Sequence, residues 1–145
     1  MVWPQYFDDI CYTPANIDRP VGFDRAGPIG AYHMIAQNLG AISKQLSKAA
    51  IDSGRSPSEI TLIGVTKTKP LEMIKKAFEA GLTDVGENYV EDFSDKQTSY
   101  HPSGLNYHFI GRLPTKKVRK IVGKAHLIHS VGSVKLAKKI DFVSS

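Results

Sequence analysis

Apolar stretches that are each followed by a helical pattern recur at nearly constant spacing, and this repeat most constrains the fold. The expected strand ends fall near Lys67, Asn88, Gly111 and Ser130, in steps of 21, 23 and 19 residues. A step of this length holds one strand, one loop and one helix. Because parallel neighbouring strands need right-handed crossovers, the units curl in one direction. The repeat therefore predicts an α/β fold, a partial (β/α) barrel of the TIM type with about four βα units.

A helix is expected before these units, because apolar residues recur at helical spacing from about Ala31 to a stop at Gly54. The expected strands are ITLIGVTK, TDVGEN, YHFIG and HLIHSVG, and the helices that follow them are PLEMIKKAFEAG, YVEDFSDKQ, PTKKVRKIVG and SVKLAKKI. Residues 1–28 are rich in proline and show no sustained period, so an irregular extension is expected there.

Composition places the chain among globular proteins and excludes several other classes. Its 145 residues, 41% of them hydrophobic, are enough for one domain of ordinary size. Cys11 is the single cysteine, so no intrachain disulfide is expected, and the reducing cytoplasm is the expected location. No apolar run approaches the roughly 18 residues of a membrane span, and the first residues lack the pattern of a secretory signal.

Polar side chains gather near the expected carboxyl ends of the strands, where barrels of this type carry their chemistry. They are Lys67, Glu87, Asn88, His108, Arg112, His129 and Ser130. Lys67 follows the apolar run at residues 60–65 and is expected to emerge from the sheet interior, where loss of water favours the neutral, nucleophilic amine. Lys69 adds like charge but precedes Pro70 in a turn expected to be wetter, so Lys67 is the better nucleophile.

Each of these residues also has a purely structural interpretation. Lys67 can be a solubilising lysine at a strand end. Asn88, with its neighbour Glu87, can cap the helix that follows, since asparagine is a strong N-cap, and capping is compatible with ligand contact. His108 and His129 are more typical of hydrogen-bonded core histidines than of metal ligands, so no metal site is predicted.

The motifs GVTKTKP, VGENYVED, YHFIGRLPTKKVRKIVG and LIHSVGSVKLAKKI, in this order, resemble those of the pyridoxal phosphate homeostasis proteins. The resemblance runs from about Ile35 to Ile140. That family shares a barrel similar to the N-terminal domain of alanine racemases. The resemblance implies that residues 29–145 are the N-terminal half of such a barrel and that pyridoxal 5'-phosphate (PLP) is the cofactor. It also implies that Lys67 holds PLP as a Schiff base and that Asn88 borders it.

The same resemblance implies a protein of intracellular PLP homeostasis, which buffers the cofactor and delivers it to PLP-dependent apoenzymes without catalysing a reaction. One alternative is a fragment of a racemase-type PLP enzyme, which needs a second catalytic base from an added domain, and such a domain after Ser145 is not expected. Another alternative is nucleic-acid binding, because nine basic residues at 106–145 oppose only Asp141. Salt-dependent binding to a duplex would distinguish this last class.

The sequence departs from the family pattern in two motifs and in length. GRLPTKK stands where the family commonly has glutamine and then asparagine before the lysine, and HSVGS has Gly132 in place of the usual aspartate. The family's barrel has eight strands, and its phosphate-binding loops and an arginine near the pyridine ring lie in the later half. A sheet with two unpaired edges is expected either to self-associate or to be an aggregation-prone monomer that binds PLP weakly.

Overall fold

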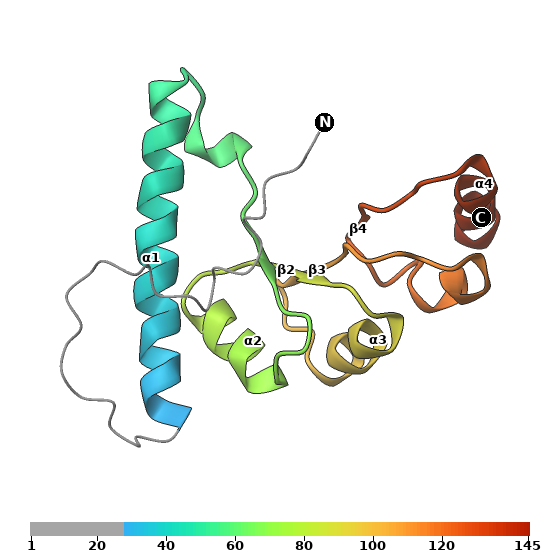
Figure 1. Cartoon of the computed structure of the whole chain (residues 1–145), viewed down its shortest axis with the longest axis horizontal. Coiled ribbons are helices and arrows are strands. Elements are labelled where there is room, and N and C mark those ends of the chain that lie inside the picture. Colours follow the sequence, from blue (N-terminus) through green and yellow to red (C-terminus); the bar gives the residue numbers. More distant parts are fainter. Residues whose placement is uncertain (1–27) are drawn as a thin grey trace. The chain divides into compact units, whose positions relative to one another are not determined.

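The computed structural model of the chain describes residues 28–145 (Figure 1). The irregular extension expected at residues 1–28 lies outside this part except for Pro28, and Cys11 also lies outside it. The chain divides into two compact units, and the boundary between them falls between Ile60 and Thr61. Among the described residues, no helix is both long enough and apolar enough to cross a bilayer.

The described part of the first unit is a long helix followed by a short one. Helix α1 spans Pro28–Asp52, and Gly54 follows it with a φ of 73°, a left-handed conformation that glycine adopts without a steric penalty. The predicted helix and its end are therefore confirmed. The 3-10 helix η1, Pro57–Glu59, was not expected from the sequence, although Ser56 and Glu59 form a capping box at its start.

The second unit contains one parallel sheet whose strands follow one another in chain order, β1-β2-β3-β4. The strands are β1 (Ile63–Val65), β2 (Asp84–Glu87), β3 (Asn106–Phe109) and β4 (Leu127–Ile128). The helices that follow them in turn are α2 (Leu71–Glu79), α3 (Val90–Ser99), η2 (Thr115–Lys120) and α4 (Val134–Ser144). The α/β fold with alternating parallel strands and helices is thus confirmed.

Each strand ends one or two residues before the position expected from the sequence. The backbone hydrogen bonds nevertheless continue past the strand ends, from Thr66 N to Gly86 O at 2.9 Å and from Ile110 N to Glu87 O at 3.0 Å. The chain segments that follow the strands therefore stay together at the carboxyl edge of the sheet.

The helix expected at residues 114–123 is present as the 3-10 helix η2, and Gly123 follows it with a φ of 77°. Val118 and Ile121 are both fully buried and lie three residues apart. Side chains three residues apart share a face in a 3-10 helix and in an α-helix alike. Burial of this pair therefore anchors the segment in the core without selecting between the two helix types.

The two faces of the sheet differ in how well they are covered. Val85, Tyr107 and Phe109 point to one face and are buried, and Phe93 of α3 packs edge-to-face on the two aromatic rings at centroid distances of 5.9 Å and 6.0 Å. Figure 1 shows α2 and α3 on the same side of the strands. On the opposite face, Asp84 and His108 are buried at the centre of the sheet, whereas Leu127 of the edge strand is 52% exposed. We call these the helix face and the open face.

Candidate functional site

Lys67 lies in the tight turn that follows β1 and is half-buried. The turn is closed by a hydrogen bond from Lys69 N to Thr66 O at 3.1 Å. Thr68 has a φ of 60°, which is rare for a residue other than glycine, and its hydroxyl donates to the carbonyl of Lys67 at 2.6 Å. Lys69 is also half-buried, so burial does not separate the two lysines as the sequence argument expected.

Asn88 directly follows β2, the strand that pairs with β1, and so lies at the same edge of the sheet as Lys67. Helix α3 begins at Val90 with Tyr89 at its N-cap, and no side chain caps it. The capping role considered for Asn88 is therefore wrong, because Asn88 lies one residue too early. Its Oδ1 atom is buried and has no hydrogen-bond partner among the described residues. A buried acceptor without a partner is costly, and a ligand donor would satisfy it.

Gly111 lies directly against the backbone of Asn88. A Cβ atom at position 111 would overlap the carbonyl oxygen of Asn88, so only glycine fits without displacing the backbone. The hydroxyl of Ser130, after β4, donates to the carbonyl of Gly111. The segments that follow β2, β3 and β4 are thereby joined in sequence along the edge.

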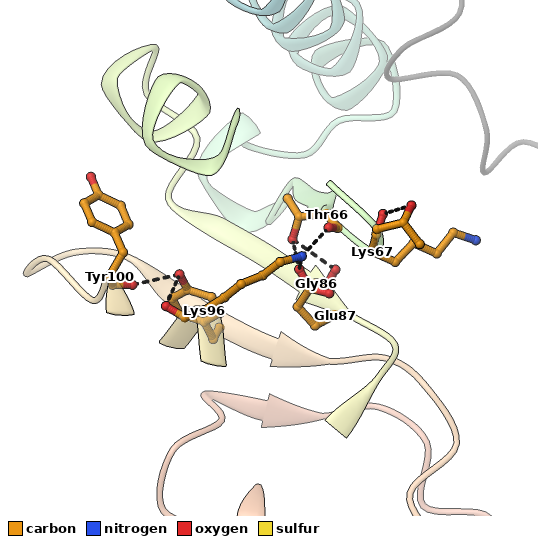
Figure 2. A network of polar contacts seen from close by, with 8 residues as sticks. Thr66, Lys67, Gly86, Glu87, Lys96 and Tyr100 are labelled. Carbon is orange, nitrogen blue, oxygen red and sulfur yellow. Dashed lines mark hydrogen bonds and ion pairs between the residues drawn. The ribbon is translucent and has the colours of Figure 1, made fainter. Parts of the chain in front are cut away.

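A buried ion pair on the helix face was not predicted from the sequence. The Glu87 side chain is 0% exposed, and its Oε1 atom accepts from Lys96 Nζ at 2.6 Å and from Thr66 Oγ1 at 2.7 Å. Lys96 Nζ also donates to the carbonyl of Thr66 at 2.8 Å, as Figure 2 shows. The sequence does contain a signal for Lys96, since it follows the buried residues Val90 and Phe93 at three-residue spacing on α3.

A second polar chain lies on the open face. His108 Nε2 is 2.9 Å from Asp84 Oδ1, and His108 Nδ1 is 3.0 Å from His129 Nε2. Burial disfavours the charged form of Asp84, but hydrogen bonds from Thr83, His108 and Asn106 outweigh it and lower the pKa of this carboxyl. Within residues 28–145, no group of three or more histidine, cysteine or acidic side chains is placed to hold a metal ion.

The structure divides the polar residues that the sequence placed together at the strand ends. Lys67, Asn88 and Ser130 follow strands at the carboxyl edge, whereas Glu87 points to the helix face and His108 points to the open face. Arg112 is exposed. The division arises because successive residues of a strand point to opposite faces of the sheet.

His129 makes stability depend on pH. Partial loss of water, and then the nearby charge of His108, lower the pKa of His129 below its ordinary value, although much of the residue is exposed. The unfolded chain thus takes up the proton more readily, so the stabilisation is complete above the ordinary pKa and is lost as the pH falls through the lower folded value. Because His129 is exposed and water screens its surroundings, we expect only a small fall in the urea midpoint between about pH 7.5 and about pH 5.5. His129→Gln should remove this fall. His101→Gln leaves the contact between His108 and His129 in place and should keep the wild-type slope, and an unchanged slope in His129→Gln would contradict the assignment.

Several curated proteins similar to this chain carry the same name. No protein-family model matches the chain. It is 37% identical over 107 residues to the pyridoxal phosphate homeostasis protein of Pseudomonas aeruginosa and 38% identical over 110 residues to that of Escherichia coli. The matches cover 74% of this chain and 46% and 47% of these relatives. This chain is related to the pyridoxal phosphate homeostasis proteins. It spans about half the length of the curated relatives that it matches.

Solved structures agree with this relationship. PipY of Synechococcus elongatus without PLP matches with a TM-score of 0.66 at 33% identity, over 76% of this chain and 47% of PipY. PipY with PLP bound matches with a TM-score of 0.57 at 36% identity, over 70% of this chain and 47% of PipY. A Bifidobacterium adolescentis protein at 24% identity and a TM-score of 0.70 shares the fold. The resemblance to pyridoxal phosphate homeostasis proteins that the motifs indicated is confirmed.

Proposed function

We propose that this chain binds PLP and takes part in intracellular PLP homeostasis, with Lys67 as the residue that holds the cofactor covalently. The observation that carries the proposal is the position of Lys67 and Asn88 at the carboxyl ends of two adjacent parallel strands, where α/β proteins commonly bind ligands. The name of the curated relatives and the PLP-bound structure of PipY support it.

The residues at this edge fit the chemistry of the cofactor. Bound PLP supplies an electrophilic aldehyde. Lys67 offers a primary amine on a turn whose backbone is hydrogen-bonded at Thr66 and Lys69. Asn88 offers a buried amide oxygen that lacks a partner among the described residues and that a donor group of the cofactor would satisfy.

We further propose that the sheet is part of the wall of an alanine-racemase-like (β/α) barrel, with residues 29–145 as its N-terminal half. Parallel strands in unbroken chain order support this proposal, because barrels are built in that order. β1 and β4 are the edge strands of the sheet in the part of the chain that the structure describes, and Leu127 of β4 and Val131 after it are exposed, which favours further pairing, including self-association.

The role we propose is that of a carrier without catalytic activity, which buffers PLP and passes it to PLP-dependent apoenzymes. Two observations support this role. They are the family resemblance and the name of the relatives, which refers to homeostasis and does not name a reaction. A cytoplasmic location remains a prediction from the single cysteine, Cys11.

Borohydride trapping tests the covalent assignment. PLP added to the folded protein, followed by borohydride and peptide mapping, should place the label on Lys67. Lys67→Arg should lose that label, because a guanidinium keeps the charge without offering a free amine. The matched variant Lys69→Arg should keep it. Label on Lys69, or spread evenly over the surface lysines, would overturn the assignment.

The same titration tests Asn88. Asn88→Ala should weaken PLP binding by about tenfold, the value of one buried hydrogen bond, while the label stays on Lys67. An unchanged affinity would remove Asn88 from the proposed site.

A further inference from the structure

The buried ion pair on the helix face ends on the turn that carries Lys67 (Figure 2). Lys96 Nζ donates to the carbonyl of Thr66, the residue directly before Lys67, at 2.8 Å. The same carbonyl accepts the backbone N–H of Lys69 at 3.1 Å. The carbonyl oxygen of Thr66 therefore links helix α3 to the turn and also closes the turn around Lys67.

Burial distinguishes this ion pair from the ion pairs of the surface. The Lys96 side chain is 13% exposed and that of Glu87 is 0% exposed. The pair between Lys117 and Glu91, which also reaches α3, has exposed fractions of 34% and 54%. Water screens a surface pair and lets its side chains move, whereas a buried lysine held by a carboxylate stays in one position. Lys96 thus provides a fixed donor at the end of β1.

The turn itself needs such support. Thr68 has a φ of 60°, and a residue with a side chain holds this conformation only where its surroundings impose it. Three hydrogen bonds hold the turn. The Lys69 amide and the Lys96 ammonium both donate to the carbonyl of Thr66, and the Thr68 hydroxyl donates to the carbonyl of Lys67. Removal of the Lys96 ammonium would free the Thr66 carbonyl from α3.

We propose that Lys96 is a positioning residue that directs Lys67 through the backbone. Glu87 holds the ammonium of Lys96, the ammonium holds the carbonyl of Thr66, and this carbonyl sets the direction in which the side chain of Lys67 leaves the turn. Figure 2 shows the side chain of Lys67 extending away from Lys96, so the proposed influence of Lys96 on Lys67 runs through the backbone of the turn. The role assigned to Lys67 rests on the proposed function, whereas the anchoring of the turn does not.

The experiment uses variants that separate the anchor from a buried unpaired charge. Lys96→Met alone leaves the Glu87 carboxylate without its cation, so the decisive variant is Glu87→Gln/Lys96→Met, which removes both charges. Lys96→Arg retains a charged donor and serves as the conservative rescue. Lys117→Met is the matched control, because it removes a lysine that contacts α3 without touching the turn.

The first readout is amide hydrogen exchange in the protein without PLP. In the double variant, exchange at the Lys69 amide should become about tenfold faster relative to the amides of β3, the effect expected for losing a hydrogen bond from a charged donor. Lys96→Arg and Lys117→Met should retain wild-type protection. Equal acceleration of all sheet amides, or none at Lys69 in a folded double variant, would overturn the proposal.

The second readout is the share of borohydride-trapped PLP label at Lys67 relative to Lys69. This share should fall severalfold in the double variant and stay at the wild-type value in Lys117→Met. An unchanged share, with wild-type labelling on Lys67, would show that the anchor does not direct this side chain. If wild-type protein takes no label at Lys67 while the Lys69 amide responds as expected, the proposed function fails and the anchoring of the turn stands.

Discussion

Lys96→Met should lower the free energy of unfolding by about 3–5 kcal/mol, the cost of removing one partner from a buried ion pair. The variant leaves the carboxylate of Glu87 in a position where it is 0% exposed, with only the hydroxyl of Thr66 donating to it. Its Oε2 atom already lacks a partner among the described residues, so no second donor compensates for the loss. Urea denaturation followed by far-UV circular dichroism measures the effect.

Two further variants show whether the unpaired charge is the cause. Glu87→Gln/Lys96→Met should lose markedly less stability than Lys96→Met, because an uncharged amide costs less to bury than a lone carboxylate. Lys117→Met should change the urea transition very little, because its ion pair with Glu91 is exposed. Equal losses in the single and double variants would show that packing of the Lys96 side chain, and not charge pairing, stabilises this region.

Gly111→Ala should destabilise the protein by about 3 kcal/mol, at the upper end of the usual cost of overpacking. The added Cβ atom would overlap the carbonyl oxygen of Asn88, which belongs to the backbone and cannot move aside by changing a rotamer. The segments after β2 and β3 would have to separate at the edge that carries the candidate site. The loss of stability is measured by urea denaturation.

Gly132→Ala is the matched control for this effect. A Cβ atom at position 132 meets no atom within 4 Å, and the residue has no positive φ. This substitution should be neutral or should stabilise the protein by up to about 1 kcal/mol, because alanine restricts the unfolded chain. If Gly111→Ala were tolerated as well as Gly132→Ala, the close approach of the two segments would be wrong.

The stability losses expected for Lys96→Met and Gly111→Ala arise at different places along the carboxyl edge of the sheet. The ion pair of Lys96 and Glu87 lies on the helix face, while Gly111 lies where the segment after β3 meets Asn88. A change in PLP binding without a change in stability would therefore point to Lys67 or Asn88 themselves. A loss of PLP binding together with a loss of stability would point to the ion pair or to the contact at Gly111.

Local patterns in the sequence determined the order and type of most elements. Regularly spaced apolar stretches predicted four parallel strands with helices between them, and Gly54 marked the end of α1. The lysine motif at Lys67 and the asparagine at Asn88 fell at the ends of adjacent strands, as expected. Such features depend on residues that are close in the chain, so a single sequence contains them.

The tertiary structure alone decided which polar groups meet. Glu87 faces Lys96 and Thr66, while His108 faces Asp84 and His129, because neighbouring residues of a strand point to opposite faces. Partners 21 or 24 residues apart are brought together by the register of the parallel strands, which no local pattern specifies. Helix type and the first residue of a helix depend on packing as well as on local propensity, so the 3-10 form of η2 and the start of α3 at Val90 were seen only in the folded structure.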